Sequence, residues 1–149
     1  MTGSTKKPRG AVLLDLDRSV VGSEFDRTVL DPVTADEIRE YASFTGEPVG
    51  VNKAGIMTAP ASFVLRMRGK RFMPRNLPDL GRSGFDAGKD IEILGDVHPG
   101  DVLTTVSTVH DLYEKTGRSG AMTFLVLRSV ITNQKGERVA VIDQRMMFR

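Results

Sequence analysis

Three long runs of strand-forming residues in the last third of the chain constrain its fold more than any other feature. β-Branched and other apolar residues recur in Val102–Tyr113, Met122–Thr132 and Val139–Phe148, a composition that favours strands. Turn residues fill the short segments between them, Lys115–Gly120 and Asn133–Gly136. Strands joined by such short loops pair as antiparallel neighbours, so we expect a β-meander with one face to bury.

Helix signals lie upstream of this meander. Thr34 and Glu37 form a capping box, apolar side chains follow at helical spacing, and Gly46 has the usual position for ending a helix. A proline opens a second helix over Ala61–Arg68, and an extended segment from Phe25 to Asp31 precedes both. Because the meander needs a layer to cover its apolar face, we expect an α+β fold in which an antiparallel sheet wraps around the second helix as a central helix.

The segments between that helix and the meander are rich in turn formers. Gly69–Gly88 is a long loop of Gly, Pro and Arg, and loops of this length tend to cover a site or mediate contacts. Asp90–Leu94 is predicted as a short strand, and His98–Asp101 as a tight turn with Pro and Gly at its two central positions. No repeat or linker interrupts the order, so residues 11–149 are expected to form one domain behind a flexible tail at residues 1–10.

Composition excludes several classes of function. The chain has 149 residues, no cysteine and two histidines, which excludes a disulfide framework, a thiolate or histidine-rich metal site and a cysteine nucleophile. Its formal net charge of +2 is small for a nucleic-acid-binding domain, so no nucleic-acid partner is predicted. No run approaches the roughly 18 apolar residues of a membrane span, so we expect no span and a cytoplasmic protein.

The segment Tyr41–Asn52 carries the strongest functional signal. It reads Tyr-Ala-Ser-Phe-Thr-Gly-Glu-Pro-Val-Gly-Val-Asn. This resembles, without a gap, the motif Tyr-x-x-x-Ser-Gly-Asp-x-Asn-Pro-x-His of the MaoC-like dehydratases, also called R-specific enoyl-CoA hydratases. Ala59–Phe63, His98–Asp101 and Tyr113–Gly120 also resemble segments of that family, particularly of its N-terminal-type domains. The resemblance covers nearly the whole chain after about Phe25, and it implies the hot-dog fold.

Two substitutions fall on the positions of the family's catalytic pair. Glu47 stands where the family has its catalytic Asp, and Asn52 where it has its catalytic His; in the family these side chains activate the water that adds to the enoyl double bond. Asn52 cannot transfer a proton at neutral pH, and such a step contributes roughly 10²–10⁴ in rate. The two histidines of the chain offer no replacement for the catalytic His, because His98 is predicted to be a solvated loop residue and His110 a sheet-face residue.

The resemblance also implies a substrate-binding set. In the family, backbone N–H groups at the start of the central helix polarise the thioester carbonyl. The implied residues here are Tyr41, Thr45, Gly46, Ala59, Ala61, Ser62, Arg66, Arg68 and Arg71. A basic cluster comprises Arg66, Arg68, Lys70, Arg71 and Arg75, and Lys53 and Arg82 could join it. It either binds the phosphates of coenzyme A or is a solvated helix end and loop, and both interpretations stay open.

Three functions remain open on this basis. The first is a non-catalytic hot-dog subunit that shapes the acyl pocket beside a catalytic MaoC-like chain in an acyl-CoA hydratase or dehydratase. The second is an active homodimeric enoyl-CoA hydratase that uses Glu47, and the third is a non-enzymatic acyl-CoA-binding or scaffold protein. In each case we expect a dimer with an identical or different hot-dog domain, which would protect an exposed strand edge. We expect no cofactor and no metal, with an acyl-CoA thioester as the ligand or substrate.

Overall fold

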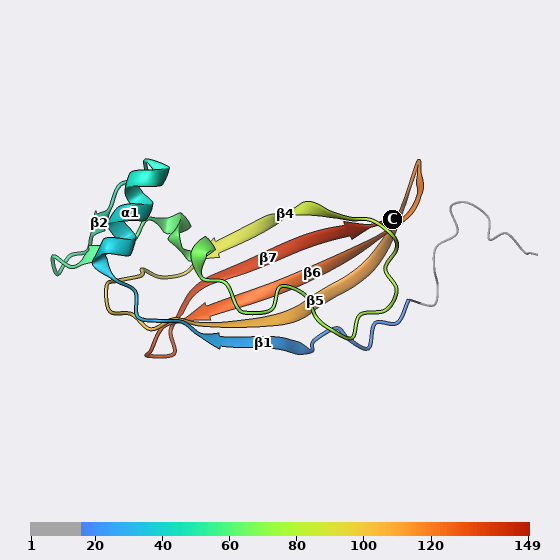
Figure 1. The fold of residues 1–149 in the computed structure, drawn as a ribbon, viewed down its shortest axis with the longest axis horizontal. Helices are drawn as coiled ribbons and strands as arrows, with labels where there is room; N and C mark the ends of the chain where they lie inside the picture. Colours follow the sequence, from blue (N-terminus) through green and yellow to red (C-terminus); the bar gives the residue numbers. More distant parts are fainter. Residues whose placement is uncertain (1–15) are drawn as a thin grey trace, which may run out of the picture.

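The computed structural model describes residues 16–149, so the predicted tail at residues 1–10 lies outside the described part. One five-stranded antiparallel sheet dominates it, with the strand order β1-β5-β6-β7-β4 (Figure 1). The strands are β1 (Glu24–Val29), β4 (Gly84–Ile93), β5 (Thr104–Gly117), β6 (Gly120–Thr132) and β7 (Arg138–Phe148). The predicted meander is therefore confirmed as β5, β6 and β7, and β1 and β4 are the outer strands.

The first predicted helix is confirmed as α1 (Ala35–Thr45). Thr34 Oγ1 accepts a hydrogen bond from the Glu37 N–H at 3.1 Å, and Glu37 Oε2 accepts one from the Thr34 N–H at 2.9 Å, which completes the capping box. Gly46 ends the helix with φ 75°, a left-handed conformation that glycine adopts without a steric penalty. Local sequence alone accounts for both ends of this helix.

The second helix departs from the prediction in type and length. In place of a helix over Ala61–Arg68, the chain forms a six-residue 3-10 helix, η1 (Ala61–Arg66). Just after the helix, the backbone is held by the sheet: the Thr105 hydroxyl of β5 donates a hydrogen bond to the Met67 carbonyl at 3.0 Å. Short helices gain most of their stability from tertiary contacts, so packing decides where this one stops.

Two further boundaries differ from the predictions. β4 begins at Gly84 instead of Asp90, because the residues from Gly84 pair with the end of β7, where Gly84 lies opposite Phe148. The loop before β4 therefore ends at residue 83. β5 and β6 continue until Gly117 faces Gly120, which reduces the predicted six-residue turn to two residues. In both cases ladder hydrogen bonds extend the strand beyond what local composition favours.

A two-stranded hairpin and a tight turn complete the fold. The hairpin consists of β2 (Gly50–Val51) and β3 (Met57–Thr58) and follows α1 in the chain. The turn at His98–Asp101 is confirmed: the Asp101 N–H bonds the His98 carbonyl at 3.1 Å, and Gly100 has φ 86°.

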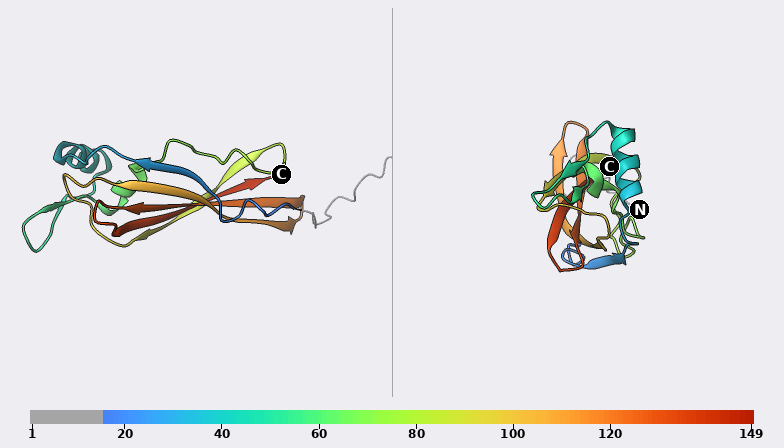
Figure 2. Two further views of the ribbon diagram at one scale, coloured as in Figure 1. Left: turned by 90° about the horizontal axis from the view of Figure 1, so that it is seen from below. Right: turned by 90° about the vertical axis from the view of Figure 1, so that its left-hand side faces the viewer.

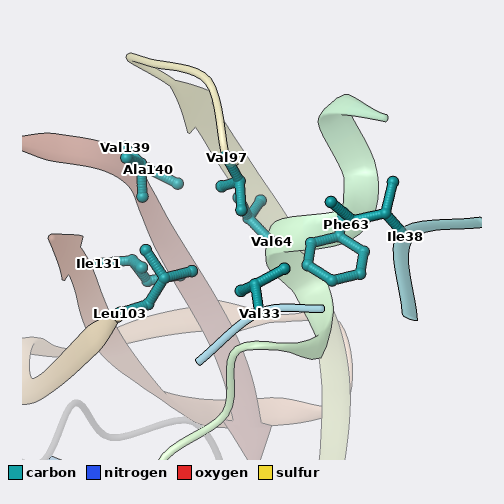
Figure 3. Close-up of a cluster of buried hydrophobic side chains, with 9 residues drawn as sticks. All are labelled: Val33, Ile38, Phe63, Val64, Val97, Leu103, Ile131, Val139 and Ala140. Carbon is teal, nitrogen blue, oxygen red and sulfur yellow. The ribbon is translucent and has the colours of Figure 1, made fainter. Parts of the chain in front are cut away.

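The core is divided into two clusters along the sheet. The helix-side cluster joins α1 and η1 to one end of the sheet, and comprises Val33, Ile38, Phe63, Val64, Val97, Leu103, Ile131, Val139 and Ala140 (Figure 3). The distal cluster comprises Val20, Val109, Leu112, Leu125 and Leu127. Both helices lie at one end of the sheet, and the segment after η1 runs lengthwise along it (Figures 1 and 2). The helical layer therefore covers only part of the sheet.

Candidate functional site

A hydrogen-bonded group of three side chains joins the motif segment to η1. The Tyr41 hydroxyl, on α1, lies 2.6 Å from Ser62 Oγ, and Ser62 Oγ donates to the Glu47 carboxylate. Thr45 holds the intervening loop, since its hydroxyl donates to the Tyr41 carbonyl at 2.8 Å and accepts from the Glu47 N–H at 3.3 Å. All three central side chains are half-buried. The structure thus brings Tyr41, Thr45, Glu47 and Ser62 together as one site.

Asn52, which the sequence resemblance aligned with a catalytic His, has a structural role in the hairpin. Its side-chain oxygen accepts hydrogen bonds from the N–H groups of Ala54 and Ile56, each at 2.9 Å, and so holds the turn between β2 and β3. Its backbone N–H also bonds the Ile56 carbonyl at 2.9 Å. The side chain therefore stabilises the loop and has no titratable proton for acid–base chemistry.

The backbone amides before η1 are only partly available. The Ala59 N–H donates to the Val97 carbonyl at 2.8 Å, so that amide is already occupied. The first bond of η1 runs from the Phe63 N–H to the Pro60 carbonyl at 2.9 Å, which leaves the amides of Ala61 and Ser62 ahead of it. Of the three amides implied by the resemblance, Ala59 is excluded as a free donor.

The predicted basic cluster is divided between two places. The Arg66 guanidinium lies 5.9 Å from the centroid of the Tyr41 ring and 5.8 Å from that of Phe63, which places it beside the Tyr41–Ser62–Glu47 group. Arg68, Lys70 and Arg71 instead line the main cavity, and Arg75 lines a smaller one of about 150 Å³ with Arg71.

The main cavity, of about 320 Å³, opens between the sheet and the segment that follows η1. Its lining combines four cations with an apolar and hydroxyl-bearing wall, and comprises Phe25, Leu65, Met67, Arg68, Gly69, Lys70, Arg71, Phe72, Lys89, Ser107, Leu127, Ser129, Ile142 and Gln144. None of these described lining residues carries a carboxylate. A pocket with an apolar body and a cationic rim suits an amphipathic anion.

Sequence reasoning missed the four polar side chains that the sheet contributes to this lining: Lys89, Ser107, Ser129 and Gln144. Ser129 and Gln144 each stand between apolar residues two positions away on either side in β6 and β7. The sequence shows that polar residues interrupt these apolar positions. Whether their side chains point toward or away from the cavity depends on the bulges that set strand register.

In the described part of the chain, neither histidine side chain makes a hydrogen bond to the Tyr41–Ser62–Glu47 group. His98 is half-buried, with Nδ1 at 3.1 Å from the Met57 carbonyl, so the prediction of a solvated loop residue is wrong. His110 lies in β5 as predicted, exposed at the bulge between Val109 and Asp111.

Two absences hold for the described residues. Within residues 16–149, no group of three or more acidic, histidine or cysteine side chains is placed to hold a metal ion. In the same part of the chain, no helix has the length and apolar character needed to cross a membrane.

Comparison with known proteins decides the family. A family model described as the FAS1-like, dehydratase domain region matches residues 19–142. The chain belongs to this family. No curated protein matches the sequence of this FAS1-like dehydratase domain.

Solved structures share the fold of this chain. The MaoC-like dehydratase from Rhodospirillum rubrum is 21% identical with a TM-score of 0.63, over 93% of this chain and 97% of that one. The ChsH1-ChsH2 complex from Mycobacterium tuberculosis is 14% identical with a TM-score of 0.63, over 84% and 83%. The HadBC (3R-hydroxyacyl-ACP dehydratase) complex from the same organism is 19% identical with a TM-score of 0.57, over 89% and 99%.

These comparisons confirm the predicted family and fold. The chain is a FAS1-like dehydratase domain, and it shares its α+β hot-dog fold with these solved structures. Two of the similar structures are complexes of two named chains.

Proposed function

We propose that this chain is the non-catalytic half of an acyl-thioester hydratase or dehydratase, and that it shapes the acyl pocket beside a catalytic hot-dog partner. The observation that carries the proposal is the position of Asn52. At the place where the family has its catalytic histidine, this side chain holds a hairpin turn through the N–H groups of Ala54 and Ile56. A site without that proton-transfer group is expected to lose roughly 10²–10⁴ in the rate of the chemical step.

The incomplete helical layer supports a pocket-forming role. Because η1 ends at Arg66, the middle of the sheet is left open, and the main cavity lies there. An acyl chain would lie against Leu127 and Ile142 on the sheet. Arg68, Lys70 and Arg71 at the rim would bind the phosphates of coenzyme A, since guanidinium and ammonium groups recognise phosphate.

The outer strand β4 is the surface proposed for the partner. Ile91 and Ile93 are 41% and 43% exposed on this strand, and Phe85 is 42% exposed. An apolar outer strand with unpaired backbone groups is an unfavourable solvent-facing surface, which pairing with another sheet removes. Pairing along β4 would place the partner's sheet next to the main cavity, because Lys89 of β4 lines that cavity.

The proposal is tested by measuring hydration of crotonyl-CoA and of a longer enoyl-CoA. We expect the purified chain alone to show no enzyme-like rate, and the complex with a co-purified hot-dog partner to be active. Glu47→Gln in this chain should leave the rate of the complex within about threefold, because Glu47 takes no part in proton transfer. Enzyme-like hydration by the chain alone would overturn the proposal.

One observation favours a second candidate, an active hydratase that uses Glu47. The Glu47 carboxylate accepts a hydrogen bond from the Ser62 hydroxyl, which itself lies 2.6 Å from the Tyr41 hydroxyl, so a proton-bearing group stands next to the carboxylate. In this case Glu47→Gln and Ser62→Ala would each abolish a rate shown by the chain alone. If the chain binds acyl-CoA by calorimetry but no partner co-purifies and no rate appears, the non-enzymatic binding protein is favoured instead.

A further inference from the structure

The sheet contributes a band of polar side chains to the floor of the main cavity, beside the apolar Phe25, Leu127 and Ile142. Ser107 faces Ser129 across β5 and β6, and Lys89 faces Gln144 across β4 and β7. Directly opposed residues of antiparallel strands point to the same face, and all four line the cavity. We call Lys89, Ser107, Ser129 and Gln144 the polar band. It lies between the helix-side cluster, which includes Ile131, and the distal cluster, which includes Leu127.

The two serines retain hydrogen-bonding capacity inside the cavity. Ser107 Oγ and Ser129 Oγ are 3.0 Å apart, and Ser107 is only 5% exposed. Each hydroxyl has one proton and two acceptor sites, so a single bond between them uses one of two protons. The second proton is available to an oxygen atom that lies over the pair.

Gln144 and Lys89 are fixed in the band by an irregularity in β4. Four residues of β4, from Asp86 to Lys89, face three of β7, from Gln144 to Met146, and this bulge turns Lys89 toward the cavity opposite Gln144. The Gln144 side-chain nitrogen donates to Asp86 Oδ1 at 2.9 Å and to the Gly88 carbonyl at 3.2 Å. Its amide is thereby oriented, and its carbonyl oxygen remains as an acceptor.

A plain hydrocarbon chain is a poor match for such a floor. Covering a buried hydroxyl with methylene groups removes its access to water and offers no partner in exchange. An acyl group with a hydroxyl or keto oxygen at the level of the band would fill the cavity and satisfy these groups. We infer that the main cavity selects acyl thioesters whose acyl part carries an oxygen substituent where it crosses Ser107, Ser129 and Gln144. This inference rests on the proposed function, because it assumes that the acyl part enters this cavity.

Calorimetry with matched thioesters tests the inference. Dodecanoyl-CoA is compared with a series of dodecanoyl-CoA isomers that carry one hydroxyl or keto group at successive positions along the chain, using the full-length protein in the assembly in which it purifies. We expect at least one substituted isomer to bind about tenfold more tightly than the parent, the effect of one satisfied hydrogen bond in a buried site.

The variants assign the preference to the band. The double change Ser107→Ala and Ser129→Ala removes both partners of one bond, and should reduce the affinity advantage of the substituted isomer over dodecanoyl-CoA to within about twofold. Gln144→Met provides an independent variant of similar volume. Ser119→Ala, in the turn between β5 and β6, is the matched control and should keep the wild-type preference.

The possible outcomes separate the inference from the proposed function. If the wild type binds the parent and every isomer equally well, or if the serine variant keeps the full preference, the inference is overturned and the acyl pocket stands. If no acyl-CoA binds, the proposed acyl pocket fails and the inference fails with it. If the serine variant does not fold, as judged by its thermal unfolding, the wild-type series and Gln144→Met still decide.

Discussion

The hydroxyl of Ser62 donates a hydrogen bond to the carboxylate of Glu47, across 15 residues of sequence. This bond connects the start of η1 to the loop that follows α1. The same hydroxyl lies 2.6 Å from the Tyr41 hydroxyl, so one serine joins three segments of the candidate site. The Glu47 carboxylate is thus held within a hydrogen-bonded frame.

Loss of the Ser62 hydroxyl should destabilise the domain modestly. In Ser62→Ala, Tyr41 and Glu47 each lose a partner, but both are half-buried and can be hydrated. We therefore expect the free energy of unfolding to fall by about 1 kcal/mol, measured by urea denaturation. Ser43→Ala, at an exposed position of α1, is the control and should change little. Equal losses in the two variants would contradict a specific role for Ser62.

The stability of the domain should decrease in acid through Asp143. Two hydrogen bonds from the Arg128 guanidinium, each of 2.7 Å, hold the pKa of the Asp143 carboxyl below its ordinary value of 3.8. The unfolded chain therefore takes up this proton at a higher pH than the folded one. The stabilisation is complete above the unfolded value and is lost as pH falls through the folded value.

Asp143→Asn tests this dependence. At neutral pH we expect it to lower the free energy of unfolding by about 1 kcal/mol, because the Arg128 partner is partly exposed and the pair is screened. The difference from wild type should shrink as the pH is lowered below 3.8, where Asp143 also becomes protonated. Asp36→Asn, which removes an exposed pair with Arg39, should show no such convergence. Urea titrations at several pH values provide the measurement.

Neutralising the rim of the main cavity should weaken acyl-CoA binding. Lys70→Gln and Arg71→Gln should each raise the dissociation constant by about threefold at low salt, the value of one exposed charge contact. The effect should diminish as salt screens the phosphates. Arg82→Gln removes a charge from the same loop away from the cavity lining, and should leave affinity unchanged. Calorimetry in two salt concentrations distinguishes rim binding from a general charge effect.

A charge on the outer strand β4 should prevent assembly. Ile91→Lys would place an ammonium group in the proposed interface and remove apolar burial, so we expect partner affinity to fall about tenfold or more. Val29→Lys, on the opposite outer strand and 67% exposed, is the control and should assemble normally. Light scattering after size-exclusion chromatography measures both. Disruption by Val29→Lys alone would move the interface to β1.

Features that depend on neighbouring residues could be predicted from the sequence. The capping box at Thr34, the left-handed Gly46 and the hairpin loop at Asn133–Gly136 depend on a few adjacent residues, and all three were correctly predicted. The meander followed from the shortness of its connections. The motif at Tyr41–Asn52 likewise indicated the family before any tertiary contact was known.

Features that depend on distant partners could not be predicted. The end of η1 is decided by β5, through Thr105 and Met67, and the start of β4 by its pairing with β7. The division of the basic cluster between Arg66 and the cavity rim follows from where the chain leaves that short helix.

The sequence by itself thus determined the family and the meander. The bonds of Asn52 stay within its own turn, but only the tertiary structure decided what Glu47 contacts, because its partner Ser62 lies in η1. It also decided that Ser107, Ser129 and Gln144 share one cavity floor, since strand register and the β4 bulge determine which side chains point inward. Register is a property of paired strands, and no single strand encodes it.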